Sequence, residues 1–413
     1  MKMASSKAIN KKKIFNDPVY GFITIPHEIV FHLIEHPLFQ RLRRIRQLGW
    51  SELIYPGATH TRFHHALGAM HLMMMALDSL KSKGVLITKD EHQAACIAIL
   101  LHDIGHGPYS HALEGHIIPY HHEEISLYYM QKLNLEFDSS LDLAISIFTD
   151  QYPRKFFHQL VSSQLDMDRL DYLTRDSFYT GVYEGVISYD RIIKMLDVKQ
   201  DQLVIEEKGI YSIEKFLISR RLMYWQVYLH KTVLCAEELL ILYISRIKQK
   251  RTETNTSPLL YSLLYNNTNK LYNQKASILD TYSLIDDFDI LQNIKENIHS
   301  KDSVLSTLAQ SLFYRKLYKL YFFKKKPNKS LLNKIAVLQK EMNYYLHISR
   351  TSNRTYNPSD QKINILRKDG RIIDLAQAAE ELNIHVQSQP IVKHFIIYHP
   401  VICKKILPLI QNQ

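Results

Sequence analysis

The most constraining feature of the sequence is the stretch LLHDIGHGPYSH at residues 100–111, which follows the apolar run ACIAILL. Its three histidines, one aspartate and two glycines are polar or flexible residues in an otherwise apolar helical pattern. A second polar group, YHHEE, follows at residues 120–124. Buried polar side chains are unfavourable unless they have partners. The stretch therefore indicates a functional site that is carried on helices.

Composition and periodicity predict a mostly α fold. The chain has 46% hydrophobic residues and only 12 glycines and 13 prolines, so it can bury a large core and favours helix over irregular structure. Apolar residues recur at helical spacing along much of the chain. The expected helices span residues 26–47 (two short helices meeting at Pro37), 62–83, 89–105, 110–116, 121–133, 141–149, 154–163, 166–179, 212–251, 284–298, 303–320 and 330–346.

Two segments predict β-structure. Residues 197–211 have the pattern of a hairpin, with a turn near Lys208 and Gly209. Beyond residue 351, an alternating segment around a Lys-Asp-Gly turn and a β-branched segment near the C-terminus indicate a small α+β subdomain. We therefore expect a basic tail at residues 1–15, a helical domain at residues 16–350 and the α+β subdomain at residues 351–413.

The charge and the cysteines limit the environment. A formal net charge of +11 is compatible with nucleic acid, anionic lipid or a phosphorylated small molecule as partner. The apolar runs are far shorter than the ~20 residues that span a bilayer, and no apolar signal-peptide segment follows the basic N-terminus. The three cysteines lack CxxC spacing, which is typical of reduced thiols. We expect a cytoplasmic protein without membrane association.

Four residues from separate segments predict a metal site: His65, His102, Asp103 and Asp168. Two imidazoles and two carboxylates form a mixed nitrogen and oxygen ligand set, which suits Fe, Mn, Zn or Ni rather than Ca. An adjacent His-Asp pair alone is more often a core histidine or an ion pair at a helix end. The further histidines around this pair make a metal site the better interpretation.

The order of the motifs resembles a known family. FQRLRRIRQLG (39–49), YPGATHTRFHHALG (55–68), LLHDIGHGPYSH, HHEE and DMDRLDYLTRD (166–176) follow one another along the chain. This series resembles the HD phosphohydrolases and, within them, the deoxynucleoside triphosphate (dNTP) triphosphohydrolases, over residues 16–231. The resemblance implies an HD-domain helical core at about residues 50–180. It also implies metal-dependent hydrolysis of dNTPs to deoxynucleoside and triphosphate, with Mg²⁺ accompanying the substrate.

The resemblance implies roles for single residues. The metal ligands would be the four residues above, and His111 would give a proton to the leaving oxygen, with Glu114 standing where the family has an orienting aspartate. The catalytic group as a whole would be His106, His111, Glu114, His122 and Asp166. The substrate would contact Gln47, Leu48, Arg62, Arg169, Tyr172, Asp176, Arg220 and Tyr228. A nucleotide effector would contact His230 and Lys231, at the interface of a dimer or tetramer.

Two other functions are compatible with the residues. One is an HD phosphatase or phosphodiesterase that acts on another nucleotide phosphate ester; the other is a nucleic-acid-binding protein with a subsidiary HD site. The Tyr172 and Asp176 pair, which resembles a sugar-sensing pair, favours dNTP hydrolysis over the first. The sequence has no RRM, KH, helix-turn-helix or zinc-finger signature, so we expect at most weak binding of single-stranded nucleic acid.

Overall fold

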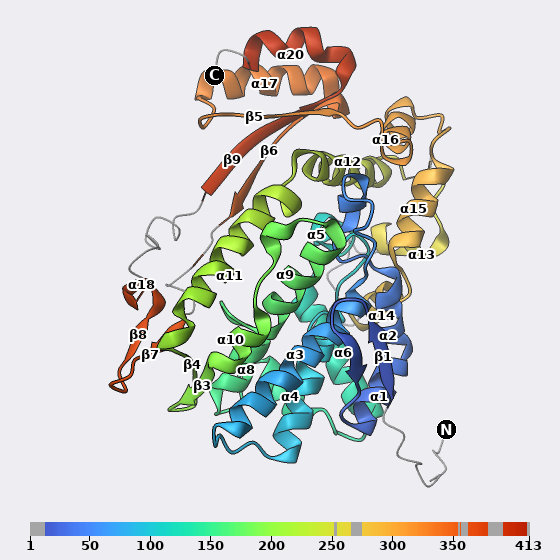
Figure 1. Cartoon of the computed structure of the whole chain (residues 1–413). Coiled ribbons are helices and arrows are strands. Elements are labelled where there is room, and N and C mark those ends of the chain that lie inside the picture. Colours follow the sequence, from blue (N-terminus) through green and yellow to red (C-terminus); the bar gives the residue numbers. More distant parts are fainter. Residues whose placement is uncertain are drawn as a thin grey trace.

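The computed structural model describes residues 13–251, 254–265, 275–353, 356, 362–378 and 391–410. The predicted mostly α fold with small β-sheets is confirmed. In Figure 1 a body of helices carries a C-terminal sheet above it and a second sheet at its side. Of the predicted tail at residues 1–15, only the last three residues lie inside the described part. Among the described residues, no helix has both the length and the apolar character needed to cross a lipid bilayer.

The described chain begins with an antiparallel hairpin of β1 (Ile14–Asp17) and β2 (Gly21–Thr24). The backbone N–H groups of Val19 and Tyr20 each donate to Oδ1 of Asp17 at 3.0 Å and close the turn. The helices α1 (Glu28–Glu35) and α2 (Pro37–Gln40) meet at Pro37, as the sequence predicts. Two 3₁₀ turns, Arg41–Arg44 and Gly49–Leu53, follow.

Three long helices form the centre of the body. The helix α3 (Arg62–Ser82) packs against both α4 (Lys89–Leu101) and α9 (Met167–Thr180), and its side chains are buried along most of its length. A capping box begins α4, because Thr88 and Glu91 each bind the backbone N–H of the other. The shorter helices of this region are α5 (Ser110–Leu113), α6 (His122–Glu136), α7 (Asp142–Phe148), α8 (Lys155–Val161) and α10 (Tyr189–Met195).

The predicted long helix at residues 212–251 is interrupted. The chain forms α11 (Ile210–Met223), a π-helical turn at Tyr224–Tyr228 and then α12 (Lys231–Gln249). The side chain of His230 accepts from the backbone N–H of Thr232 and begins α12. Single π-turns inside helices are frequent at functional sites. Apolar periodicity continues through the interruption, which is why the pattern predicts one helix.

The predicted hairpin is present, but its turn lies elsewhere. The strands β3 (Leu196–Lys199) and β4 (Gln202–Glu206) are joined at Gln200 and Asp201, which have φ values of 53° and 56°. Positive φ at both positions is the conformation of a tight two-residue hairpin turn. Gly209 lies in a 3₁₀ turn, Glu207–Gly209, where a Cβ would approach Ile205 and Met195 within 3 Å. Close packing against Ile205 and Met195, and not the hairpin turn, accounts for the glycine at this position.

The C-terminal third contains helices and two sheets. Its helices are α13 (Pro258–Tyr265), α14 (Lys275–Tyr282), α15 (Asp287–Glu296), α16 (Ser303–Phe313), α17 (Lys329–Met342), α18 (Leu375–Ala378) and α20 (Cys403–Ile410). Its strands are β5 (Lys319–Phe322), β6 (Leu346–Asn353), β7 (Asn364–Leu366), β8 (Ile372–Asp374) and β9 (Ile391–Tyr398). One sheet has the order β5-β9-β6, and the other, β3-β4-β7-β8, joins the two predicted hairpins.

Two predictions for this region need correction. The helix expected at residues 303–320 ends at Phe313, and residues 319–322 form β5 because Lys319 to Phe322 pair with β9. The boundary expected at residue 351 falls inside β6. The α+β unit also includes β5 and α17, which precede residue 351. These elements belong to it because a separate core lies between the β5-β9-β6 sheet and the helices α17 and α20.

Candidate metal centre and substrate cavity

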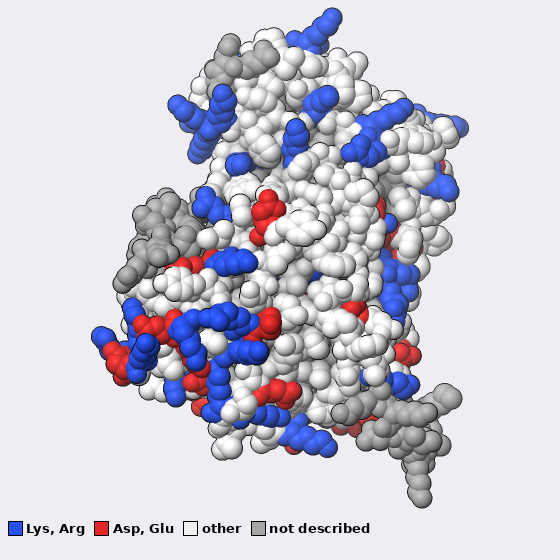
Figure 2. Space-filling view, viewed as in Figure 1, with Lys and Arg blue, Asp and Glu red and all other residues white. Residues whose placement is uncertain are grey.

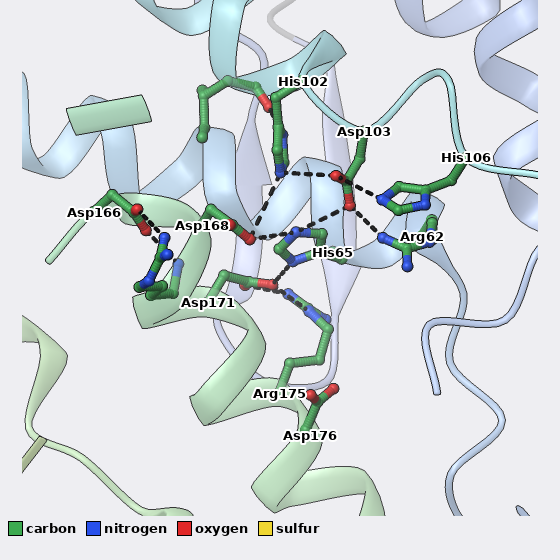
Figure 3. Close-up of polar contacts among 12 residues, drawn as sticks. Arg62, His65, His102, Asp103, His106, Asp166, Asp168, Asp171, Arg175 and Asp176 are labelled. Atoms are coloured by element: carbon green, nitrogen blue, oxygen red, sulfur yellow. Dashed lines mark hydrogen bonds and ion pairs between the residues drawn. The ribbon is translucent and has the colours of Figure 1, made fainter. Parts of the chain in front are cut away.

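The structure brings the four proposed metal ligands together from three helices. His65 lies on α3, His102 and Asp103 directly follow α4, and Asp168 lies on α9 (Figure 3). Nε2 of His65 is 3.1 Å from Oδ1 of Asp168 and 3.6 Å from Oδ2 of Asp103. Nε2 of His102 is 3.3 Å from Oδ1 of Asp103 and 3.6 Å from Oδ1 of Asp168. Single ligand atoms of His65, His102 and Asp168 lie within 4.8 Å of one another, as donors around one cation would, and Asp103 adjoins them with a different oxygen towards each histidine.

The remaining ring nitrogens fix the orientation of the two histidines. Nδ1 of His65 is 2.7 Å from Oδ2 of Asp171, and Nδ1 of His102 is 2.6 Å from the carbonyl oxygen of Ile99. Donation from Nδ1 leaves the Nε2 lone pair free to bind a metal. Both Nε2 atoms are buried, and their contacts with the Asp103 and Asp168 carboxylates lack the geometry of hydrogen bonds. Such atoms are rare unless a ligand satisfies them, so the donor set fits a divalent cation.

Electrostatics also favour a cation here. Burial lowers the pKa of His65, but the carboxylates of Asp168 and Asp171 outweigh it and raise the pKa to about 10. Burial raises the pKa of Asp168, but His102 and His65 bring it well below its usual range. The buried carboxylates therefore remain charged and draw positive charge onto the neighbouring rings. A divalent metal would supply that positive charge in place of ring protons.

Glycines allow the elements around the site to approach closely. A Cβ on Gly68 of α3 would collide with the side chains of Asp171 and Arg175 on α9. A Cβ on Gly105 would collide with the backbone of α6 at His122 and Ser126. Ser126 then ties the loop to α6, because its Oγ donates to the carbonyl of His102 at 2.7 Å and accepts from the N–H of Gly105 at 3.0 Å.

A second group of side chains lies next to the first. Asp103, His106 and His122 form another cluster of potential ligand atoms in the described chain. The rings of His106 and His122 are stacked, with centroids 4.0 Å apart and planes 13° from parallel. Nε2 of His106 is 3.2 Å from Oδ1 of Asp103, and Nδ1 of His122 is 2.7 Å from Oε1 of Glu114, so each ring is already oriented by its own carboxylate.

His111 and Glu114 have different partners from those that the resemblance implies. Nε2 of His111 is 3.2 Å from a terminal nitrogen of Arg62, whose other terminal nitrogen is 2.5 Å from Oδ2 of Asp103. Oε1 of Glu114 is 2.7 Å from Nδ1 of His122 and accepts its backbone N–H at 2.7 Å. Glu114 thus orients His122 and not His111.

A cavity of about 470 Å³ adjoins the metal centre. Asp168 and His111 face it from the metal side. Seven of the proposed substrate contacts line it: Gln47, Leu48, Arg169, Tyr172, Asp176, Arg220 and Tyr228. Arg62 lies outside this lining and bridges Asp103 and His111. His230 and Lys231 follow the lining residue Leu229 and begin α12.

Asp166 and Asp176 are held by hydrogen bonds on α9. Asp166 caps the helix by accepting from the backbone N–H of Arg169 at 2.6 Å, and it accepts from the Arg169 guanidinium at 2.5 Å. The two oxygens of Asp176 lie 2.7 Å from Nε2 of His60 and 2.7 Å from the hydroxyl of Tyr228. The π-turn after α11 places Tyr228 in this contact.

Several site residues were not predicted. Asp171 orients His65, and it could have been found because it follows Asp168 by one helical turn and a metal-binding histidine needs an outer acceptor. Trp50 and Tyr109 line the cavity as a stacked pair, with centroids 4.6 Å apart. Glu237 lines it from α12. No local sequence pattern distinguishes these three residues from core or surface positions.

Comparison with known proteins identifies the class. Residues 62–197 match the HD domain family, and residues 187–262 match the HD associated region. The chain is 31% identical over 395 residues to the uncharacterised protein YwfO of Bacillus subtilis, a match that covers 89% of this chain and 88% of that protein. The chain belongs to the HD-domain phosphohydrolases, and it is a hydrolase.

Two further comparisons narrow the group. The crystal structure of a phosphohydrolase from Bacteroides thetaiotaomicron is 46% identical, with a TM-score of 0.88, and the match covers 94% of this chain and 100% of that chain. The chain is 32% identical over 242 residues to the deoxynucleoside triphosphate triphosphohydrolase SAMHD1 homolog of Dictyostelium discoideum, covering 53% of this chain and 46% of that protein. The family resemblance that the motifs indicate is confirmed, although the chain spans less than half of that relative.

Proposed function

We propose that this protein hydrolyses dNTPs to deoxynucleoside and inorganic triphosphate. One observation carries the proposal: Asp168 belongs to the metal-ligand group and also lines the cavity. A nucleotide in the cavity would therefore have its phosphates next to the metal. His65, His102, Asp103 and Asp168 would hold the metal, a divalent Fe, Mn, Zn or Ni ion. When bound, such an ion lowers the pKa of a coordinated water and polarises a phosphate oxygen.

The residues of the chain supply the remaining chemistry. Arg169 and Arg220 face the cavity and would bind the β- and γ-phosphates, with Mg²⁺ accompanying the triphosphate. His106 and His122 would face the same anion. Burial, followed by the charge of Arg62, lowers the pKa of His111 to about 4. A bound triphosphate would raise that pKa again, because an anion favours the protonated ring. His111 could then donate a proton to the departing 5′-oxygen.

The sugar would lie against α9. Asp176 already accepts from Tyr228, and its carboxylate would also accept from the 3′-hydroxyl. Tyr172 lines the cavity and would pack under C2′, where a ribose hydroxyl would not fit. Gln47 and Leu48 would contact the base. In this arrangement each of these cavity residues has the role that the family resemblance implies for it.

We also propose an effector site, a cellular location and a limit on nucleic-acid binding. His230 and Lys231 would bind an effector nucleotide in a dimer or tetramer; their position beside the cavity residue Leu229 supports this. The chain carries unpaired Cys96, Cys235 and Cys403, which supports a cytoplasmic location. On the face shown in Figure 2, Lys and Arg side chains are dispersed, and those at the lower left lie among Asp and Glu. That distribution favours, at most, weak binding of single-stranded nucleic acid.

Product analysis tests the function. The protein is incubated with each dNTP and NTP in the presence of Mn²⁺, Fe²⁺ or Mg²⁺, and phosphorus NMR follows the products. We expect intact triphosphate as the first phosphorus-containing product from dNTPs. Orthophosphate would instead support an HD phosphatase, and pyrophosphate with a monophosphate would support cleavage at another bond. Salt-dependent binding of single-stranded DNA, without hydrolysis, would favour the nucleic-acid-binding alternative.

A further inference from the structure

A line of buried charged side chains leads from the metal centre to the N-terminal hairpin. Oδ2 of Asp171 lies 2.7 Å from Nδ1 of His65 and accepts from Nε of Arg175 at 3.0 Å. On its other side, Arg175 donates to Oδ2 of Asp17 at 2.7 Å. The side chains of His65, Asp171 and Arg175 have no exposed surface, and that of Asp17 is 4% exposed. The line is therefore shielded from water along its length.

Arg175 fixes the orientation of the Asp171 carboxylate. Its Nε donates to Oδ2, and one terminal nitrogen donates to Oδ1 at 3.0 Å. This paired contact prevents the carboxylate from rotating, because a planar guanidinium matches both oxygens at once. The carboxylate is thereby held with Oδ2 towards His65. Figure 3 shows Asp171 between the His65 ring and the Arg175 guanidinium.

Asp17, at the hairpin end of this line, makes two sets of hydrogen bonds. Its Oδ1 accepts from the backbone N–H groups of Val19 and Tyr20 and so closes the turn between β1 and β2. Its Oδ2 accepts from Arg175. The Tyr20 ring also lies 5.4 Å from the Arg175 guanidinium. The position of the hairpin and the position of Arg175 are therefore set by the same carboxylate.

We propose that Asp17 and Arg175 are positioning residues for His65, so that docking of the β1–β2 hairpin and retention of the metal stabilise each other. The inference rests on the metal centre proposed above. Coupling between two equilibria is reciprocal, so loosening the hairpin weakens metal binding and removing the metal loosens the hairpin by the same free energy. Residues outside a metal's direct ligands commonly change its affinity by about 10- to 100-fold.

The first test compares two substitutions of similar character. Asp17→Asn keeps the size of the side chain and an oxygen for the hairpin turn, but it weakens the contact with Arg175. Asp302→Asn removes the charge of another nearly buried aspartate that pairs with an arginine, Arg246, at 2.5 Å and 3.1 Å, far from the metal centre in the sequence. The dissociation constant for Mn²⁺ is measured by electron paramagnetic resonance of the free ion, alongside thermal unfolding without metal.

We expect Asp17→Asn to raise the Mn²⁺ dissociation constant by about tenfold or more, while Asp302→Asn leaves it unchanged. Equal Mn²⁺ affinity in the wild type and Asp17→Asn would overturn the inference. A wild-type protein that binds no metal would instead overturn the proposed metal centre. The two failures are thus distinguishable, and the unfolding data separate a loss of affinity from a general loss of stability.

The second test needs no substitution. Hydrogen exchange of the wild-type protein is followed by mass spectrometry with Mn²⁺ and after chelation. We expect faster exchange in residues 14–24 after the metal is removed, with unchanged exchange in the β5-β9-β6 sheet. Identical exchange of residues 14–24 in both states would overturn the coupling, even if the metal binds tightly.

Discussion

At the residue scale, the metal centre depends on which ring nitrogen of each histidine is engaged by the protein. His65 and His102 both use Nδ1 internally, one towards a carboxylate and the other towards a backbone carbonyl, and both present Nε2 to the same point. His106 lies close by, but its ring is stacked on His122 and its Nε2 is 3.2 Å from Asp103. Neighbouring histidines therefore have different roles because their second contacts differ.

The metal-binding role of His102 gives a direct prediction. His102→Ala removes one of four donors, and we expect the metal content after dialysis to fall by more than about tenfold. Elemental analysis measures it. His92→Ala is the control, because His92 also lies on α4 and binds another histidine, His27, at 3.0 Å. Full metal content in His102→Ala would show that the ligand assignment is wrong.

Glu237 should make substrate binding depend on pH. Burial, with Glu238 adding to it, raises the pKa of Glu237 to about 8. Below that pH the carboxyl is neutral; above it, a negative charge lines the cavity that the proposed triphosphate would enter. Two like charges ~4 Å apart repel by about 1 kcal/mol in water, so we expect KM to rise roughly fivefold as the pH passes 8.

Steady-state kinetics between pH 7 and about 9.5 measure this effect. This pH range covers the values at which Glu237 loses its proton. Glu237→Gln cannot ionise, and its KM should stay flat over the same range. Glu238→Gln keeps Glu237 but removes the charge that helps to raise its pKa, so its KM should still rise, beginning at a lower pH; Glu238 itself binds His347 at 3.3 Å and lies outside the cavity lining. A KM that rises equally in Glu237→Gln would assign the pH dependence to another group.

At the scale of elements, the site depends on how closely α3 and α9 approach. The contact occurs at Gly68, where the Asp171 and Arg175 side chains of α9 fill the space that a Cβ would take. The π-turn at Tyr224–Tyr228 has a comparable effect on the other side of the cavity, since it turns Tyr228 towards Asp176. Gly68 and the π-turn therefore each serve a contact at the site.

Gly68→Ala distinguishes close packing from helix propensity, because the two predict opposite changes in the free energy of unfolding. Alanine in a helix interior is normally more stabilising than glycine by about 1 kcal/mol. Overpacking against Asp171 and Arg175 should outweigh this and destabilise the protein by about 1–3 kcal/mol. Chemical denaturation measures the free energy of unfolding. A stabilised Gly68→Ala protein would mean that α9 can move away from α3 without loss.

At the scale of the whole molecule, the C-terminal sheet is shared between two cores. Along β9, Phe395 and Ile397 face the main core, whereas Ile396 and Tyr398 face the core under α17 and α20. This alternation is the ordinary result of strand geometry, with both faces covered. The second sheet likewise pairs β4 with β7, which lies far along the chain.

Because β9 contributes to both cores and β7 pairs with β4, we can predict how the protein responds to removal of its C-terminal segment. A chain ending at residue 350 lacks β9 and β7 and exposes apolar side chains of both cores, so we expect it to aggregate or to be degraded rapidly by protease. A chain ending at Ile410 retains every described strand and should remain folded. Solubility, limited proteolysis and circular dichroism of the two truncated proteins check this. A folded, active chain ending at residue 350 would support the domain boundary expected from sequence.

The sequence predicts the regular helices well, and it selects four candidate metal ligands that the structure brings together, because helical periodicity and metal-ligand types are local signals. The sequence misplaces the hairpin turn, since Gly209 is required by packing, and it misses the break after α11, since Tyr224–Tyr228 keeps apolar periodicity. Contacts between distant segments could not be predicted, because no local pattern in the sequence indicates them. The pairing of β4 with β7 and the contact of Asp17 with Arg175 join segments more than a hundred residues apart.

The stacked Trp50 and Tyr109 pair has an optical consequence. The chain contains only two tryptophans, and the other, Trp225, has the ammonium of Lys393 3.8 Å from its ring centre. Trp50 lines the cavity and its indole N–H has no hydrogen-bond partner among the described residues. In a Trp225→Phe protein, all tryptophan emission would come from the cavity wall. Nucleotide entry could then be followed in real time by intrinsic fluorescence, without any attached dye.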